Sequence, residues 1–269
     1  MLKKGSKIIH TLCLQLKKQN ISVYSASTAF FFFLSMVPFL IVLCTMIPYT
    51  PLTEENLVKA ITDIMPDMVD PLIESLIAQV YQNSSTILPI AVLTTIWSAG
   101  KGMLALMRGL NVVDGVEEKR NYFVVRLVAS FYTVIMLLIV LVSLLIMVFG
   151  NKLVNLILYR IPSLKTIVTL IMNLRFMFIW LILIVLFAAI YAYVPNKKQK
   201  FSEQLPGAVF TSVVWSIFSW GFSIYVELSD FSIYGSLAII IIIMLWMYFC
   251  MYIIMVGAFI NEYCLTVQK

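Results

Sequence analysis

The sequence predicts an all-α membrane protein with six transmembrane helices. Hydrophobic residues make up 62 % of the 269 residues, and only 12 % are charged, whereas about 25 % of a soluble domain is charged. The mean hydropathy is strongly positive, at +0.99. The apolar residues are grouped into segments of about 20, which is the length that a helix needs to cross a bilayer.

The predicted membrane domain covers residues 27–262. We expect its spans at 27–47, 85–109, 127–149, 176–194, 207–226 and 236–260. An even number of spans places both termini on one side, and most of the 19 lysines and arginines fall on that side. Because positive charge is enriched in cytoplasmic loops, both termini are predicted to be cytoplasmic.

The segments outside the spans have amphipathic patterns. Residues 1–26 carry lysines beside an apolar stripe at helical spacing, which favours a helix lying in the membrane interface; a solvated basic tail is the alternative. Residues 48–84 are acidic, and we expect two short outer helices separated by breaks at Pro66 and Pro71. Residues 151–175 are interpreted as an outer hairpin or a re-entrant segment, and residues 263–269 as a short cytoplasmic tail.

The stretch from Trp97 to Arg120 contains the candidate functional site. If the second helix crosses near residues 85–109, Lys101 lies within the membrane and Arg108 at its edge. Seven residues are nearly two helical turns, so both cations share one face. In one interpretation, Lys101 extends to the headgroups and only anchors the helix. In the other, Lys101, Arg108 and Asn111 bind an anion such as a lipid phosphate, because charge inside a span by default marks a site.

A strip of small residues, Gly102, Ala105 and Gly109, lies beside these cations and is suited to close helix packing, within one chain or between two. The fifth span carries serines at steps of four, three and four, which places them on one face. They form either a packing surface or the polar wall of a cavity: Ser212, Ser216, Ser219 and Ser223.

Pro38 lies within the first span, where it removes a backbone donor and is predicted to kink the helix. A hydroxyl such as that of Ser35 is a candidate to satisfy the freed carbonyl.

Several functional classes are disfavoured by composition. The chain has one histidine, His10, and its four cysteines form no close pair and no metal-ligand spacing. We therefore expect no metal site, no cofactor and free thiols. No nucleophile is placed near a base, and no carboxylate pair lies within the spans, so the chain is not expected to be an enzyme. The net charge of +6 is accounted for by membrane orientation and anionic lipids, and no nucleic-acid partner is expected.

The ordered motifs of this chain resemble the YihY/BrkB family of integral membrane proteins, formerly labelled ribonuclease BN. The resemblance extends over nearly the whole chain and is carried by these segments: Ala29–Pro38, Leu106–Asn111 with Val116 and Glu117, Leu205–Ala208 with Trp215 and Tyr225, Tyr234–Leu237, Leu245–Tyr248, and Gly257, Ala258 and Asn261. The sequence departs from the family at Phe259, where a glutamate is usual, and at Ala238, where a glycine is common. The resemblance implies a six-helix protein of the bacterial cytoplasmic membrane and a suggested role in lipid or envelope-precursor transport.

Two functional hypotheses follow. The first is a flippase-like translocator or exporter of an anionic lipid or envelope precursor, with the cations holding the phosphate and the serines lining its path. No P-loop is present, so transport would be passive, ion-coupled or powered by a partner. The second is a non-transporting scaffold for envelope assembly, with the acidic segment 54–82 docking a protein partner. A metal-dependent ribonuclease is rejected because a single histidine cannot build its metal site. The sequence leaves the oligomeric state open.

Overall fold

The computed structural model describes residues 19–46, 70–160, 175–197, 199–229 and 236–267. The described residues contain no strand. They form a short 3-10 helix, η4 (Phe201–Gln204), and six long helices: α2 (Ile21–Met46), α4 (Asp70–Val113), α5 (Tyr122–Arg160), α7 (Arg175–Tyr193), α8 (Leu205–Leu228) and α9 (Ser236–Val267).

The all-α membrane architecture is confirmed. Five described segments are long and apolar enough to cross a bilayer, and α7 adds a shorter apolar segment, Trp180–Tyr193. Large apolar side chains point outward along these helices, among them Leu127 at 71 % and Trp220 at 70 % exposure. A surface of this kind is suited to acyl chains and not to water.

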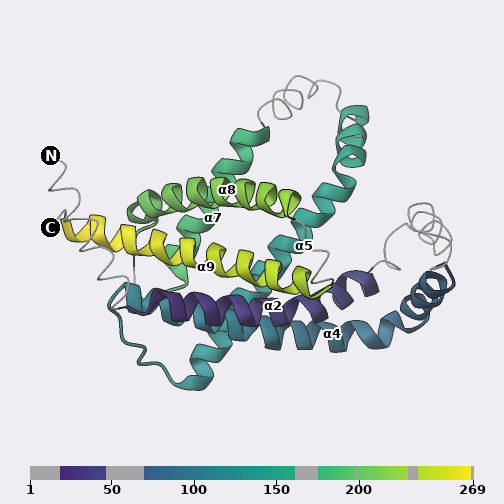
Figure 1. Cartoon of the computed structure of the whole chain (residues 1–269), viewed down its shortest axis with the longest axis horizontal. Coiled ribbons are helices and arrows are strands. Elements are labelled where there is room, and N and C mark those ends of the chain that lie inside the picture. Colours follow the sequence, from purple (N-terminus) through teal and green to yellow (C-terminus); the bar gives the residue numbers. More distant parts are fainter. Residues whose placement is uncertain (1–18, 47–69, 161–174, 198, 230–235, 268–269) are drawn as a thin grey trace.

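The long helices alternate in direction. In Figure 1, α2, α4, α8 and α9 run roughly side by side, whereas α5 and α7 run obliquely to them. The beginnings of α2 and α8 meet the ends of α4, α7 and α9 at one end of the molecule, which we call the polar end. The beginning of α2 and the end of α9 therefore lie at the same end of the molecule, as an even number of spans requires.

The prediction of a separate outer helix after Pro71 is wrong. α4 is one continuous helix of 44 residues that begins at Asp70. Pro71 lies in its first turn, where a proline costs no hydrogen bond, and no turn-forming sequence interrupts the helix before the span. At 1.5 Å per residue, α4 is about 66 Å long and exceeds the thickness of a bilayer.

The predicted boundaries of the third and sixth spans also change. α5 begins at Tyr122 and continues to Arg160, so Arg126 belongs to a helix and residues 151–160 extend α5 instead of starting a hairpin. α9 continues to Val267 and includes most of the predicted tail. In both cases, polar residues at a helix end were interpreted as the end of the helix, although nothing there breaks it. Residues 161–174 and most of the predicted amino-terminal helix lie outside the described residues.

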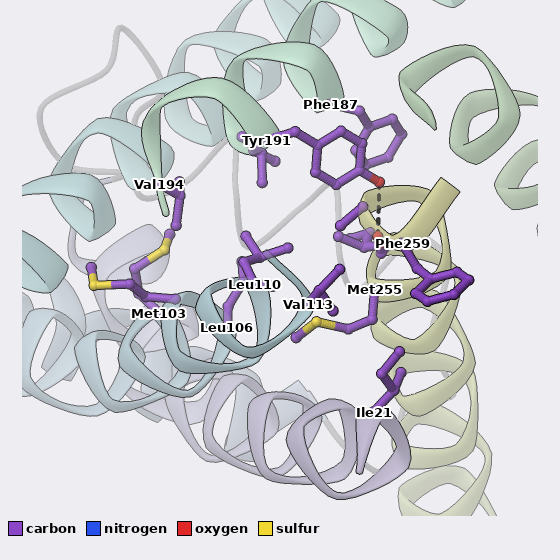
Figure 2. Close-up of a cluster of buried hydrophobic side chains, with 14 of the residues drawn as sticks. Ile21, Met103, Leu106, Leu110, Val113, Phe187, Tyr191, Val194, Met255 and Phe259 are labelled. Atoms are coloured by element: carbon purple, nitrogen blue, oxygen red, sulfur yellow. Dashed lines mark hydrogen bonds between the residues drawn. The ribbon is translucent and has the colours of Figure 1, made fainter. Parts of the chain in front are cut away.

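The buried core lies toward the polar end, where α4, α7 and α9 meet (Figure 2). Met107, Leu110 and Met255 are fully buried there, and Tyr191 is almost so. In lipid, helices are held together by close packing and interhelical hydrogen bonds. This core therefore depends on the fit between side chains and on the polar contacts that surround it.

Candidate functional site

The two predicted cations share a face of α4, as expected, and that face is the outer one. Lys101 and Arg108 are both exposed, in line with the exposed Trp97 one turn before Lys101. The Lys101 ammonium lies 5.7 Å from the ring centre of Phe31 on α2. Their predicted part in holding an anion stays a prediction, and any such anion would lie on the exterior of the helix bundle.

The small-residue strip beside these cations packs within the chain. A Cβ atom on Gly102 would lie 2.7 Å from the Phe32 ring of α2, and one on Gly109 would collide with Met255 of α9. The two glycines therefore allow α2 and α9 to approach α4 closely. This result answers the question that the sequence left open about whether the strip packs within one chain.

An apolar groove lies on another face of α4, between α2 and α5. Its wider part is a cavity of about 220 Å³ that is partly open to the exterior. A second cavity of about 110 Å³ continues it away from the polar end, and both are bordered by Phe39 and Leu137. The wider part is lined by Phe32, Ser35, Met36, Phe39, Ala99, Met103, Thr133, Met136, Leu137, Val140 and Met251.

The groove offers little hydrogen-bonding capacity to a ligand. Its three hydroxyl groups donate to backbone carbonyls of their own helices: Ser35 to Phe32, Thr95 to Ala91 and Thr133 to Ala129. Donation back to a preceding carbonyl occupies the hydroxyl proton. The lining is therefore chemically suited to hydrocarbon.

Proline residues lie in two of the helices that form this groove. Pro38 in α2 is adjacent to Phe39, and Pro89 in α4 lies one turn before the groove residue Val92. Each proline removes one backbone hydrogen bond from its helix. The Ser35 hydroxyl donates to the carbonyl of Phe32 and not to that of Leu34, which is the carbonyl freed by Pro38. Pro89 was missed because the apolar run around it gave no other sign of interruption.

Along α8, the serine stripe changes from buried at Ser212 to exposed at Ser223. Ser212 is buried and its hydroxyl donates to the Ala208 carbonyl, while the Ser216 hydroxyl donates to the Ser212 carbonyl. The Ser219 hydroxyl oxygen is buried without a hydrogen-bond partner within the described chain, and Ser223 is exposed. The wall of the groove is formed by other residues, so the predicted transport path along the stripe stays a prediction.

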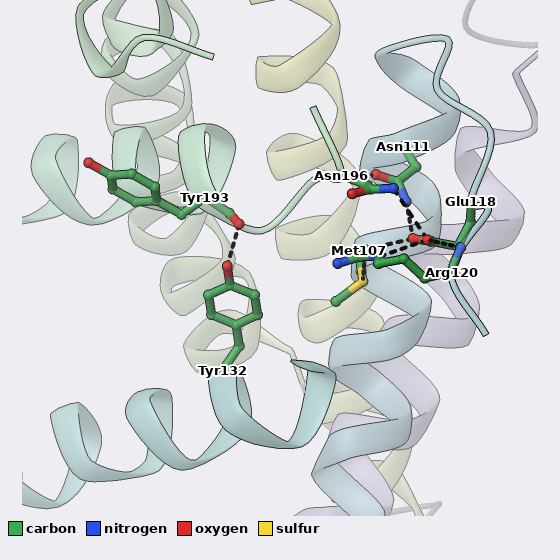
Figure 3. A network of polar contacts seen from close by, with 7 residues as sticks. All are labelled: Met107, Asn111, Glu118, Arg120, Tyr132, Tyr193 and Asn196. Atoms are coloured by element: carbon green, nitrogen blue, oxygen red, sulfur yellow. Dashed lines mark hydrogen bonds and ion pairs between the residues drawn. The ribbon is translucent and has the colours of Figure 1, made fainter. Parts of the chain in front are cut away.

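Asn111 is part of a compact polar network at the polar end (Figure 3). Its side-chain amide donates to Glu118, 3.1 Å away, and its side-chain oxygen accepts from the backbone N–H of Asn196 at 2.7 Å. Glu118 in turn receives two hydrogen bonds from the Arg120 guanidinium, at 2.7 and 2.8 Å. These bonds join the loop after α4 to the loop after α7, and they lower the pKa of Glu118 below its usual value.

A second polar group joins the same two loops to α9. The Lys197 ammonium forms a 2.7 Å ion pair with Glu262 and lies 3.4 Å from the Asp114 carbonyl. Burial raises the pKa of the Asp114 carboxyl to about 6, although a hydrogen bond from Gln199 and the charge of Lys197 oppose the shift. Asp114 is thus an acid that changes charge close to physiological pH.

Close backbone contacts complete the polar end. Gly207 of α8 meets the Gly257 carbonyl of α9, and a side chain on either glycine would collide with its neighbours. The Gly207 N–H donates to the Asn261 side chain at 2.6 Å. The Tyr191 hydroxyl is hydrogen-bonded to the Thr211 hydroxyl at 2.6 Å and donates to the Ile254 carbonyl of α9. Gly207, Gly257 and Asn261 therefore form the closely packed seam between α8 and α9.

A profile of the family described as virulence factor BrkB matches residues 12–268. The chain belongs to the BrkB family. The resemblance drawn from the motifs is thereby confirmed, and the protein is an integral membrane protein of this family.

Relatives agree with the BrkB assignment. The putative ribonuclease-like protein YfkH of Bacillus subtilis (strain 168) is 35 % identical over 240 residues, which cover 88 % of this chain and 87 % of that protein. The UPF0761 membrane protein VV0203 of Vibrio vulnificus (strain YJ016) is 38 % identical over 74 residues, 27 % of this chain and 24 % of the relative. The UPF0761 membrane protein PBPRA3489 of Photobacterium profundum is 41 % identical over 76 residues, covering 27 % and 23 %. No solved structure matches the chain.

In this chain, the part that the structure describes holds no group of three His, Cys, Asp or Glu side chains that could bind a metal ion.

The polar end contains the residues that sequence reasoning missed. Asp114, Glu118, Lys197 and Glu262 follow three different predicted spans, and none of them was among the predicted site residues. A signal was available, because spans two, four and six all end on the same side. Charges of both signs placed just after these spans can meet there.

Proposed function

We propose that this BrkB-family protein moves an anionic lipid or envelope precursor across the membrane, as a flippase-like translocator or exporter. The observation that supports this proposal is the apolar groove between α2 and α5. It lies within the spans, is open on one side, and has hydroxyl groups that are already bonded. A groove of this chemistry accommodates an acyl chain while the headgroup stays outside it.

The helices around the groove are suited to a change of shape. Pro38 and Pro89 each leave α2 and α4 with one fewer backbone hydrogen bond, and such positions are where membrane helices bend. The polar end, by contrast, is joined by ion pairs and close glycine contacts. In this proposal α2 and α5 separate to admit an acyl chain while the polar end holds the helices in register.

The three residues predicted to contact the headgroup differ in whether their side chains are accessible to it. Lys101 and Arg108 are exposed and free to approach a phosphate on the exterior of the bundle. Asn111 is 3 % exposed and already bonded on both its amide nitrogen and its oxygen. We therefore assign Asn111 to holding the loops and keep Lys101 and Arg108 as the candidates for headgroup contact.

A lipid-scrambling assay in proteoliposomes tests the proposal. Ala99→Trp places a large ring in the groove, and Gly221→Trp adds the same ring at an exposed site on α8 where nothing lies within 4 Å. We expect the protein to accelerate scrambling, Ala99→Trp to abolish the effect, and Gly221→Trp to preserve it. Lys101→Ala combined with Arg108→Ala should reduce the rate for anionic lipids. An unchanged scrambling rate on adding protein would contradict the proposal.

One observation favours the scaffold function as a second candidate. α4 and α5 contain 44 and 39 residues, lengths of about 66 and 58 Å that exceed a bilayer of about 40–45 Å. The beginning of α4 and the end of α5 can therefore project beyond the membrane and contact a protein partner. Stoichiometric crosslinking of a partner to residues 70–84, together with scrambling that does not change on adding protein, would favour this function.

A further inference from the structure

Lys101 and Arg108 on α4 and Arg126 on α5 have no carboxylate partner among the side chains that the structure describes. The ion pairs among the described residues involve Arg120, Lys197 and Lys200, and none includes Lys101, Arg108 or Arg126. An unpaired cation beside lipid is costly unless an anion neutralises it or it reaches water. The surroundings of these cations therefore decide what satisfies them.

Arg126 is fixed in place against the outer face of α4. Its guanidinium donates to the Trp97 carbonyl at 2.9 Å and lies over the Trp97 ring, 4.7 Å from the ring centre. It also lies 4.0 Å from the Cβ position of Gly100, the residue just before Lys101. One N–H of the Arg126 guanidinium is therefore already hydrogen-bonded, and its remaining N–H donors can bind a ligand.

Lys101 lies on the same exposed face of α4 as Trp97. Its ammonium lies 5.7 Å from the ring centre of Phe31 on α2, and Trp97 lies one helical turn away along α4. Each cation is thus oriented by an aromatic ring, an arrangement that limits side-chain freedom before a ligand arrives. Lys101 and Trp97, the ring that orients Arg126, therefore lie on one exposed face of α4.

The neighbouring surface is apolar and outward-facing. Trp97 is 64 % exposed, and Phe123 and Leu127 near the start of α5 are 72 % and 71 % exposed. Tyr122 begins α5 and is also exposed, and tyrosine and tryptophan are enriched where membrane helices meet the headgroups. The nearest anion for a site in such a surface is the phosphate of a membrane lipid.

We propose that Arg126 and Lys101, held over Trp97 and Phe31, form a binding site for the phosphate of an anionic phospholipid in the leaflet at the polar end. The guanidinium binds the phosphate through its fork, and the ammonium adds a point charge. Basic sites between transmembrane helices are an established means of binding anionic headgroups. This inference extends the headgroup role proposed above for Lys101, and lipid binding at this site does not require the groove to move lipid.

Native mass spectrometry of the full-length protein in detergent tests this inference. Phosphatidylglycerol and phosphatidylcholine with identical acyl chains are titrated against the wild type and a variant carrying Lys101→Gln and Arg126→Gln. We expect the wild type to favour phosphatidylglycerol. Each substitution should weaken this binding roughly fivefold, and the two together more than tenfold.

The matched control removes the same number of charges elsewhere. Lys119→Gln with Lys200→Gln changes two exposed loop lysines and should leave the preference for phosphatidylglycerol intact. Equal weakening in both double variants, or in neither, would overturn the site. So would displacement of the lipid by inorganic phosphate, since a lipid site requires the acyl chains.

Misfolding is distinguished from loss of the site by Arg126→Lys. This variant keeps the charge and loses the fork, so it should retain thermal stability while the preference for phosphatidylglycerol falls. An unchanged preference would show that the guanidinium geometry plays no part and would contradict the inference. Because lipid retention is measured without transport, its loss is separable from any failure of the scrambling assay.

Discussion

The polar end and the groove are built from opposite kinds of contact. At the polar end, Lys197 pairs with Glu262, Asn111 bridges two loops, and Gly207 meets Gly257 with no room for a side chain. Between α2 and α5 the residues are apolar, the hydroxyl groups bond within their own helices, and space of about 220 Å³ remains.

This difference indicates which part of the molecule can change shape. Directional polar contacts and close backbone packing allow one arrangement, whereas apolar surfaces around a void tolerate several. We therefore expect substitutions at the polar end to reduce stability and substitutions in the groove to change lipid handling with little loss of stability. The predictions below test that division.

The largest effect is expected from Gly257→Val. Its Cβ would collide with Thr211 and meet the Tyr191 hydroxyl, which is already bonded to α9. Because the backbone of Gly207 leaves no room for the new side chain to shift, we expect the free energy of unfolding to fall by about 3 kcal/mol or more. Thermal unfolding in detergent, followed by tryptophan fluorescence, measures it. Gly221→Val on exposed α8 is the control, and equal destabilisation by the two would contradict the close-packed seam.

A smaller loss is expected from Asn111→Ala. This change leaves the Asn196 N–H without its acceptor and removes one donor from Glu118. Hydrogen bonds that involve a charged group contribute about 1.5–3 kcal/mol, so we expect a loss of about 2 kcal/mol in the same assay. Lys119→Ala in the same loop is exposed and should change stability little. If Asn111→Ala behaved like that control, the network would not hold the loops together.

The raised pKa of Asp114 predicts the direction in which folding stability changes with pH. Its pKa is raised from 3.8 to about 6, so the folded protein holds the proton more tightly than the unfolded chain. The contribution of Asp114 to stability is complete below pH 4 and is lost as the pH rises to about 6, by at most about 3 kcal/mol. Glu118, whose pKa is lowered, acts in the opposite direction, with stability lost as the pH falls through that lowered pKa.

Asp114→Asn tests this sign. The variant should unfold at a higher temperature than the wild type at pH 7.5 and should lose the decline between pH 4 and pH 6. Melting curves across this range measure both effects. A wild type whose stability does not change between pH 4 and pH 6, or an asparagine variant less stable than the wild type at pH 7.5, would contradict the burial of Asp114.

The smallest change in stability is expected from Ala99→Trp. Ala99 borders the cavity of about 220 Å³, so the indole can occupy existing space. We expect the free energy of unfolding to fall by no more than about 1 kcal/mol, because the added ring enters space that is already empty. The same melting assay measures it. Destabilisation as large as that of Gly257→Val would show that the groove is as rigid as the polar end.

The fold was largely predictable because its signal is carried by hydropathy. Apolar segments of about 20 residues located the helices, and the helix that ends at Tyr193 was bounded almost correctly by Pro195. The ends of α4, α5 and α9 were not, because a helix continues through polar residues when nothing breaks it. Asp70–Ser84 and residues 151–160 are helical extensions of this kind.

The candidate site was less predictable because it depends on which helices meet. The spacing of Lys101 and Arg108 correctly placed them on one face, but one helix alone cannot show whether that face is inward or outward. Gly102 and Gly109 mark the packed side, and they could have indicated that the cations nearby point away from it. The pairing of Lys197 with Glu262 depends on a contact over 65 residues of sequence, which no local pattern reveals.

The most direct test of the account is photo-crosslinking in proteoliposomes with a lipid that carries a diazirine on its acyl chain. Labelled peptides locate the contacts along α5 and α8. If the groove takes an acyl chain, labelling at Leu137 should exceed labelling at Ile217, which is exposed on α8, and Ala99→Trp should remove that excess. Equal labelling of the two residues, unchanged by Ala99→Trp, would contradict an acyl chain in the groove.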